Sequence, residues 1–157
     1  MSYLEYFKQL RACVERNPIK LPGSLLILRN ESGQILLQQR TDGSWGLPGG
    51  LMDLGEALAG TASGEALEET GLRIGELELI DVLSGPDYYG KISNGDEFYS
   101  VTVLFSAQEV TGETKAEGAE STALRYFDLG NLPEPMEQQY LDCIAAYKRK
   151  INLASFR

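Results

Sequence analysis

The spacing of apolar residues changes several times along the chain, and each change marks the end of a predicted element. From Leu4 to Val14 the apolar positions lie three or four residues apart, which is the period of one face of an α-helix. Asn17-Pro18 ends this pattern, because the residue before a proline avoids helical backbone angles. We therefore predict an amphipathic helix at about residues 2–16, lying on the main body or on a partner chain.

Several later segments have the alternating or continuous apolar pattern of β-strands. Residues 23–30 and 34–40 flank the turn sequence "ESG", and we predict that they pair as a hairpin. Residues 76–84 alternate as a strand, residues 98–110 are apolar enough to form a central strand, and residues 122–127 form a short one. The chain therefore supplies enough strands for a sheet.

Two further helices complete the predicted fold. Residues 56–70 have a helical pattern that Gly71 would end in a left-handed conformation. Residues 136–150 form a closing helix, whose expected core contacts are Leu141, Ile144, Ala145 and Tyr147. The order helix, strands, helix, strands, helix predicts a single α+β domain over residues 1–157, with helices covering a sheet.

The composition restricts the function classes. The net charge of −9 argues against a nucleic-acid polymer or an anionic membrane as partner, although a divalent cation can bridge an acidic site to phosphate. Histidine is absent, so histidine-based catalysis and histidine-bound zinc are excluded. The distant pair Cys13 and Cys143 suggests reduced, buried thiols, and no transmembrane run or signal peptide is visible. We expect a cytoplasmic protein.

Three carboxylates crowd one face of the second predicted helix. Glu65, Glu68 and Glu69 lie within about one turn, where like charges repel and the field of the helix C-terminus disfavours acids. Clustered carboxylate oxygens are what Mg²⁺ requires, and the preceding sequence "GLPGG" lets the backbone approach a ligand closely. The helix alone fits a solvated acidic face equally well, so both interpretations stay open at this point.

The spacing around these glutamates resembles the Nudix box. That motif is Gly, five residues, Glu, seven residues, Arg-Glu, an apolar residue, any residue, Glu-Glu, any residue, Gly and an apolar residue. The sequence from Gly50 to Leu72, "GLMDLGEALAGTASGEALEETGL", matches every fixed place except the arginine, which is Gly64. So many fixed positions in one short segment make the resemblance highly specific.

The resemblance implies a Nudix fold, an α/β/α sandwich with a mixed β-sheet between helices. It also implies hydrolysis of a nucleoside diphosphate linked to another moiety, by water attack on phosphorus, with Mg²⁺ or Mn²⁺ as cofactor. By the family's pattern the catalytic and metal-binding glutamates are Glu65, Glu68 and Glu69, with the carbonyl of Gly49 as a further ligand. Glu120, beyond the box, is the best match for a last metal ligand, and Glu117 is the alternative.

The remaining site residues are implied less directly. Gly50, Glu56 and Gly71 would support the site. Arg40 could meet substrate phosphate or be a solvated strand end, and Tyr88 and Tyr89 could stack on a base or pack their loop onto the sheet. The implied partner is a small nucleotide-derived substrate, and the apolar first helix leaves a homodimer open.

The missing arginine leaves three hypotheses. Arginine can hold carboxylates in a fixed geometry and glycine cannot, so Gly64 could give a slower enzyme. A basic residue from elsewhere could replace the arginine, with Arg40, Arg73 and Arg125 as candidates. The third hypothesis is a Nudix-fold nucleotide-binding or regulatory protein with weak or no turnover.

Overall fold

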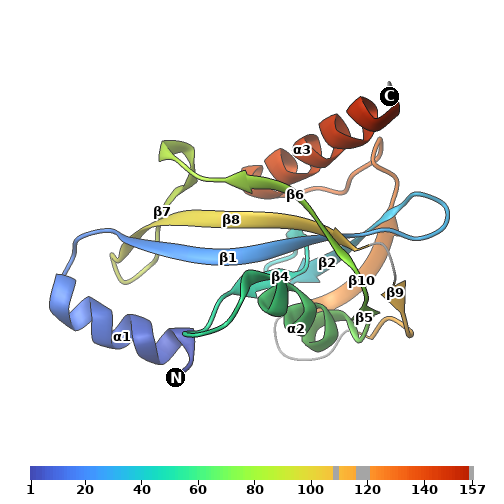
Figure 1. Cartoon of the computed structure of the whole chain (residues 1–157). Helices are drawn as coiled ribbons and strands as arrows, with labels where there is room; N and C mark the ends of the chain where they lie inside the picture. Colours follow the sequence, from blue (N-terminus) through green and yellow to red (C-terminus); the bar gives the residue numbers. More distant parts are fainter. Residues whose placement is uncertain (108–109, 116–120, 156–157) are drawn as a thin grey trace.

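The structure is a computed structural model that describes residues 1–107, 110–115 and 121–155. Three α-helices and ten strands follow one another, with one short 3₁₀ helix before β7 (Figure 1). Their bounds are α1 (Tyr3–Val14), β1 (Ile19–Leu28), β2 (Ile35–Arg40), β3 (Trp45–Gly46), β4 (Gly49–Leu51), α2 (Leu58–Thr70), β5 (Arg73–Ile74), β6 (Leu77–Leu83), η1 (Pro86–Tyr88), β7 (Tyr89–Lys91), β8 (Glu97–Ala107), β9 (Val110–Thr111), β10 (Ser121–Phe127) and α3 (Gln138–Ser155).

The strands form three sheets. The largest is mixed, with the order β4-β1-β8-β6 and with β7 added alongside β8. Within it β1 and β8 run parallel, from the pair Ile19–Phe98 to the pair Leu28–Ala107. A three-stranded antiparallel sheet has the order β10-β2-β3, and β5 pairs with β9. The α+β architecture with a mixed sheet is therefore confirmed, and β8 is an interior strand as predicted.

The predicted hairpin of β1 and β2 is wrong. The turn between them forms, because the Asn30 amide donates to the Gln34 carbonyl at 3.0 Å and Arg29 bridges to Ile35. Beyond that bridge the strands separate into different sheets. The reason is that β1 uses its two edges for β4 and β8, while β2 uses its edges for β3 and β10. Neither strand has an edge left for the other.

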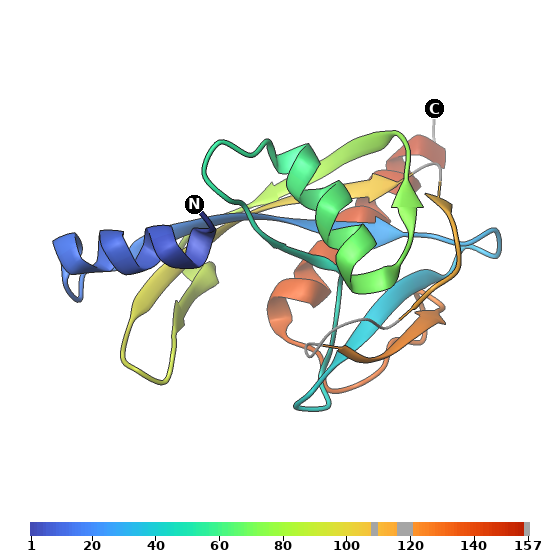
Figure 2. The same ribbon diagram turned by 90° about the horizontal axis from the view of Figure 1, so that it is seen from below.

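Alternate residues of β1 face two different cores. Leu25 and Ile27 pack with buried side chains of α3, whereas Leu26 and Leu28 pack with Ala62 and Ala66 of α2. Side chains of successive strand residues point to opposite faces, so β1 is buried on both. The two helices consequently cover opposite sides of the larger sheet, and Figure 2 shows α2 and the first turns of α3 on these two sides.

Three details of the sequence analysis need correction. On α3, Ile144 and Tyr147 are buried as expected, but Leu141 and Ala145 are only half-buried, and Tyr140, Cys143 and Ala146 take the remaining core positions. Cys13 is exposed on α1, so only Cys143 is a buried thiol, and burial raises its pKa to about 12. No strand was predicted at the sequence "GLPGG", which contains the end of β3 and the start of β4. No helix of the described residues is long and apolar enough to span a membrane.

Candidate active site

Glycines let β1 and β4 approach each other closely at the start of the box. A Cβ atom on Gly49 would lie 2.1 Å from the Ser24 carbonyl oxygen, and the φ of Gly49 is +152°. A Cβ atom on Gly23 would lie 2.6 Å from the Gly50 carbonyl oxygen. On Gly50 it would lie 2.6 Å from Cδ of Glu65. The absence of side chains therefore allows the Glu65 carboxylate to lie directly against the backbone of β4.

Helix α2 is positioned at both of its ends. The Ser24 hydroxyl on β1 donates to the Leu58 carbonyl at 2.7 Å, at the first residue of the helix. At the other end Gly71 adopts the predicted left-handed conformation, with φ +75°, and its amide donates to the Leu67 carbonyl at 3.0 Å. Ala62 and Ala66 face the core, Glu65 and Glu69 lie beside them and are directed towards β4, and Glu68 is exposed.

Hydrogen bonds from two other elements fix the carboxylate of Glu69. Its carboxylate accepts hydrogen bonds from the Gly49 amide at 3.1 Å and from Nε2 of Gln38 at 3.0 Å, and it lies within hydrogen-bonding reach of the Glu65 carboxyl. Burial raises the pKa of Glu69, and the bonds from Gly49 and Gln38, followed by the positive charge of Arg40, oppose part of that rise. The ionised form of this buried carboxylate is therefore only partly compensated by the protein.

The donor set fits a hard divalent cation. Two carboxylates in proximity, Glu65 and the half-buried Glu69, are oxygen ligands whose negative charge a dication would neutralise. Glu68 is exposed on the same helix. In the described ranges, no three His, Cys, Asp or Glu side chains lie close enough together to hold a metal ion, so Glu68 does not join Glu65 and Glu69 in one set of ligands. The predicted ligand Glu120 and its alternative Glu117 lie outside the described residues, so the structure places neither of them.

The position of the missing arginine is open. Gly64 is exposed, and no heavy atom lies within 4 Å of a Cβ built there. Glu56, which the resemblance pairs with the arginine, instead accepts a hydrogen bond from the Asp53 amide at 2.9 Å. Of the proposed substitutes, Arg73 and Arg125 are exposed on β5 and β10. Neither appears among the charges acting on Glu69, whereas Arg40 does.

Arg40 lines a cavity of about 150 Å³ next to the box. Its guanidinium lies over the Tyr140 ring, 5.4 Å from the ring centre, and donates to the Tyr140 hydroxyl. Nε of Arg40 is buried without a hydrogen-bond partner in the described part of the chain. Arg40 therefore retains a donor for a ligand. The other lining residues are Leu21, Gly23, Ser24, Leu25, Gly49, Gly50, Leu51, Ser100, Thr102, Gln139 and Tyr140.

Sequence reasoning missed the polar residues that α3 and β8 bring to this cavity. Nε2 of Gln139 donates to the Thr102 hydroxyl at 2.7 Å, and the Tyr140 ring packs so closely on Gly46 that a Cβ there would lie 2.8 Å from it. These residues are far from the box in sequence and have no motif of their own. The buried Gln38 did have a signal, because it is a polar residue at the buried end of an apolar strand.

Tyr88 and Tyr89 do not line the Arg40 cavity. The Tyr88 hydroxyl donates to Asp142 on α3 at 2.9 Å, and burial followed by this bond raises the pKa of Tyr88 to about 12. Tyr89 donates to Glu97, and its ring meets that of Tyr99 edge-on at 5.5 Å. These contacts suit the packing alternative for Tyr88, whereas Tyr89 is exposed, and a role of either ring in substrate binding stays a prediction.

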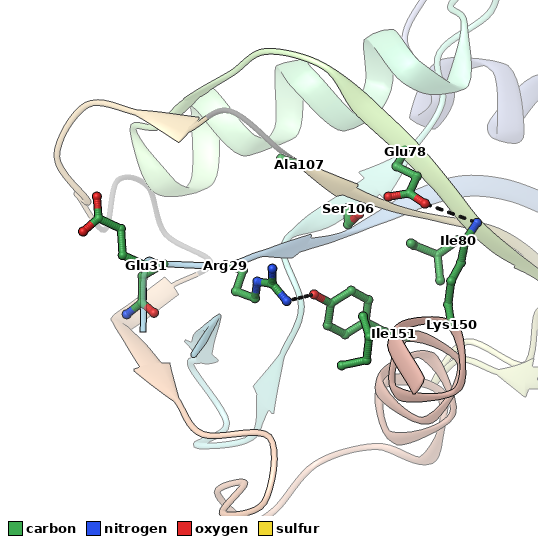
Figure 3. A pocket seen from close by; sticks show the side chains of 10 residues that line it. Arg29, Glu31, Glu78, Ile80, Ser106, Ala107, Lys150 and Ile151 are labelled. Atoms are coloured by element: carbon green, nitrogen blue, oxygen red, sulfur yellow. Dashed lines mark hydrogen bonds and ion pairs between the residues drawn. The ribbon is translucent and has the colours of Figure 1, made fainter. Parts of the chain in front are cut away.

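A larger cavity, of about 440 Å³, lies elsewhere, between β6, β8 and α3 (Figure 3). Three of its charged side chains, Arg29, Glu78 and Lys150, have partners within the described protein. Arg29 donates to the Tyr147 hydroxyl at 2.9 Å, and Nζ of Lys150 lies 2.6 Å from the Leu79 carbonyl oxygen and 3.6 Å from the Glu78 carboxylate. It contains no residue of the box, so its size does not make it the candidate site.

Comparisons with known proteins show what the chain is similar to. The NUDIX domain family matches residues 20–147. A Bacillus subtilis (strain 168) protein provisionally named an 8-oxo-dGTP diphosphatase is 35% identical over 131 residues, covering 83% of this chain and 76% of that protein. An ADP-ribose pyrophosphatase of Methanocaldococcus jannaschii is 29% identical over 111 residues, covering 69% of this chain and 62% of that protein. The crystal structure of a MutT NUDIX hydrolase from Burkholderia pseudomallei superposes with a TM-score of 0.70 at 27% identity, covering 81% of this chain and 97% of that one.

Proposed function

The chain belongs to the Nudix family, as a hydrolase acting on phosphoanhydride bonds, and on this premise we propose that it is a divalent-metal-dependent pyrophosphohydrolase of nucleoside diphosphate derivatives. The observation that carries the proposal is the half-buried Glu69 carboxylate beside Glu65, with Arg40 lining the adjoining cavity. A structural role does not require two acids side by side at a partly buried place. A site for Mg²⁺ or Mn²⁺ and phosphate does.

Each part of the site has a role in the proposed reaction. Water attacks a phosphorus of the diphosphate, the new O–P bond forms, and the anhydride P–O bond breaks. Glu65, Glu68 and Glu69 would hold the cation, with the Gly49 carbonyl as a further donor, and one of these glutamates would accept the proton of the attacking water. When bound, the cation polarises the phosphoryl oxygens and offsets their negative charge. Arg40 orients the phosphates through its guanidinium.

For the substrate, we favour an oxidised nucleoside triphosphate over ADP-ribose. The support is the higher identity and coverage of the relative named for 8-oxo-dGTP, compared with the relative named for ADP-ribose. The polar groups that line the Arg40 cavity, Thr102, Gln139 and Tyr140, suit a ligand that carries hydrogen-bonding groups.

The test is product release from a nucleotide panel at alkaline pH, with Mg²⁺, with Mn²⁺ and with a chelator. The panel contains 8-oxo-dGTP, dGTP, ADP-ribose, NADH, a dinucleoside polyphosphate and a nucleotide sugar. We expect metal-dependent cleavage, with kcat/KM for 8-oxo-dGTP at least about tenfold above that for ADP-ribose. A higher kcat/KM for ADP-ribose would overturn the substrate assignment and leave the hydrolase proposal intact.

A second candidate function follows from Gly64. If the open position at Gly64 leaves the site unable to turn over, the chain would be a nucleotide-binding or regulatory protein of the same fold. Absence of cleavage of every compound, in a folded protein that still binds one of them in a calorimetric titration, would favour this alternative. Arg40→Ala would weaken binding in either case.

A further inference from the structure

A hydrogen bond joins the N-terminal helix to the loop of the box. The amide of Tyr3, the first residue of α1, donates to Oδ1 of Asp53 at 2.6 Å. The first amides of a helix have no partner inside it, and the positive end of the helix attracts a carboxylate. The Ser2 hydroxyl and the Glu5 carboxylate already form a capping box at the same helix end. Asp53 therefore accepts a hydrogen bond from the Tyr3 amide, which the capping box of Ser2 and Glu5 does not bond.

Asp53 is also the residue that Glu56 holds. The Glu56 carboxylate accepts the Asp53 amide at 2.9 Å, and the Glu56 amide donates to the Asp53 carbonyl at 3.1 Å. The arginine that the family's pattern pairs with Glu56 is Gly64 here, and its surroundings are open. The loop between β4 and α2 therefore lacks the contact that an arginine on α2 would make with Glu56. A hydrogen bond from α1 to Asp53 contacts the loop instead.

The other end of α1 is fixed as well. Arg11 donates to the Glu97 carbonyl at 3.1 Å and to the Asn17 carbonyl at 2.7 Å, and its Nε lies 3.6 Å from Asp96. Figure 1 shows α1 standing beside the β7–β8 hairpin, away from the two cores. No residue of α1 is fully buried, so these polar contacts, rather than core packing, define where the helix lies.

We propose that α1 is a positioning element of the hydrolase, which fixes the box loop through the Tyr3–Asp53 hydrogen bond and so takes over the function of the missing arginine. The inference rests on the proposed function, because the loop leads directly into the helix that carries the metal-binding glutamates. Tyr3 and Asp53 are positioning residues and do not touch the reacting atoms. They act on the placement of α2 relative to β4.

The test uses a matched pair of variants at one position. Tyr3→Pro removes the amide hydrogen, and proline is favoured at the first position of a helix; the preceding Ser2 has an extended backbone with ψ 159°, which a following proline requires. Tyr3→Ala removes the same ring but keeps the amide. Asp53→Ala removes the acceptor, and Glu31→Ala, at an exposed carboxylate in the β1–β2 turn, controls for the loss of one negative charge.

Three measurements are made on each variant: amide hydrogen exchange of residues 52–57 without metal, Mn²⁺ affinity, and kcat with KM for the best substrate of the panel. We expect Tyr3→Pro and Asp53→Ala to speed exchange in this loop and to weaken Mn²⁺ binding and kcat by about tenfold, with KM little changed. Tyr3→Ala and Glu31→Ala should stay within about twofold of the native chain in all three. Adding Gly64→Arg to Tyr3→Pro should recover most of the loss, whereas Gly64→Arg alone should change turnover by less than about twofold.

Equal behaviour of Tyr3→Pro and Tyr3→Ala would overturn the positioning role. The positioning role would also be overturned if Gly64→Arg did not restore the kcat and Mn²⁺ affinity lost in Tyr3→Pro. The Tyr3–Asp53 hydrogen bond and an arginine at position 64 would then not have the same function. If the native chain cleaves no compound, the proposed hydrolase function is wrong, but the positioning role can still be tested. Amide hydrogen exchange of residues 52–57 and Mn²⁺ affinity then decide whether α1 fixes the loop.

Discussion

The box region and the larger cavity both have charged side chains beside the same sheet, but they differ in whether those side chains have neutralising partners. In the larger cavity Lys150 has Glu78 and a carbonyl as partners, and Arg29 has the Tyr147 hydroxyl. In the box region the half-buried carboxylate of Glu69 lies beside another carboxyl group, and the nearby positive charge of Arg40 offsets only part of the cost. Lys150, Glu78 and Arg29 thus have partners inside the protein, whereas the box region retains negative charge that a cation would neutralise.

This difference shows why cavity size is a poor guide to function here. The cavity of about 440 Å³ has internal pairs that stabilise it without a ligand, while the one of about 150 Å³ adjoins charge that the protein has not neutralised. Burying an ionised carboxylate without a full counter-charge is costly. A protein retains such a group where binding or chemistry uses it.

The largest effect should come from Glu69→Gln. We expect turnover to fall by at least about a hundredfold, because the amide cannot provide a negatively charged ligand. Without metal, the same variant should unfold at a higher temperature than the native chain near neutral pH. The measurements are kcat with saturating Mg²⁺ and thermal unfolding in chelator.

The pH dependence follows from the direction of the pKa shift. Because the pKa of Glu69 is raised by folding, its contribution to stability is full at acid pH and is lost as pH rises through the folded-state pKa. The thermal advantage of Glu69→Gln should therefore grow with pH and disappear in acid. Glu76→Gln, at an exposed glutamate between β5 and β6, is the control and should show neither effect. A Glu69→Gln protein less stable than the native chain at neutral pH would contradict this explanation.

The second effect should come from Gly50→Ala, which disturbs the box without removing any ligand. The added methyl group would lie 2.6 Å from Cδ of Glu65, and the flexible side chain can move away from it. We expect a fall in kcat of about tenfold to a hundredfold from the displaced carboxylate. Stability should change little, because side chain rather than backbone gives way. Unchanged kcat would show that the position of Glu65 against β4 is not required.

Sequence could predict the features of this site that lie close together along the chain. The box spacing placed Glu65 and Glu69 on one helix face, and Gly71 ends that helix as expected. The sequence could not predict that β1 and β2 belong to different sheets, because their apolar patterns fit a hairpin equally well. Which neighbour pairs with each strand edge is decided only when the whole chain folds.

The contacts that reach the site from far away in sequence were also beyond prediction. The hydrogen bond between Tyr3 and Asp53 joins residues that are 50 positions apart. Its donor is a backbone amide, so the pattern of side chains along the sequence does not indicate it. Tyr140 and Gln139 were hidden because a helical pattern alone does not reveal which polar residues face a cavity. For Tyr88 and Tyr89 sequence left base stacking and loop packing open, and the structure adds that their hydroxyls bond to Asp142 and Glu97.

A smaller effect, on stability alone, should come from Gly64→Ala. The position is exposed in the middle of α2 with open space around it, so alanine adds helix propensity without a clash. We expect a gain of roughly 0.5–1 kcal/mol in the free energy of unfolding, measured by urea denaturation, with turnover unchanged. A loss of stability would mean that the backbone at Gly64 departs from ordinary helix geometry.

The smallest effect should come from the larger cavity, where Glu78→Gln removes one charge of its ion pair. The Lys150 and Glu78 side chains are 41% and 46% exposed and 3.6 Å apart, so water screens their attraction. We expect a change below about 0.5 kcal/mol in the free energy of unfolding, and kcat and Mn²⁺ affinity equal to those of the native chain. Lys150 keeps the Leu79 carbonyl as partner in this variant, which limits the disturbance further. A loss of turnover in Glu78→Gln as large as that of Gly50→Ala would break the comparison, because it would place the larger cavity in the catalytic function.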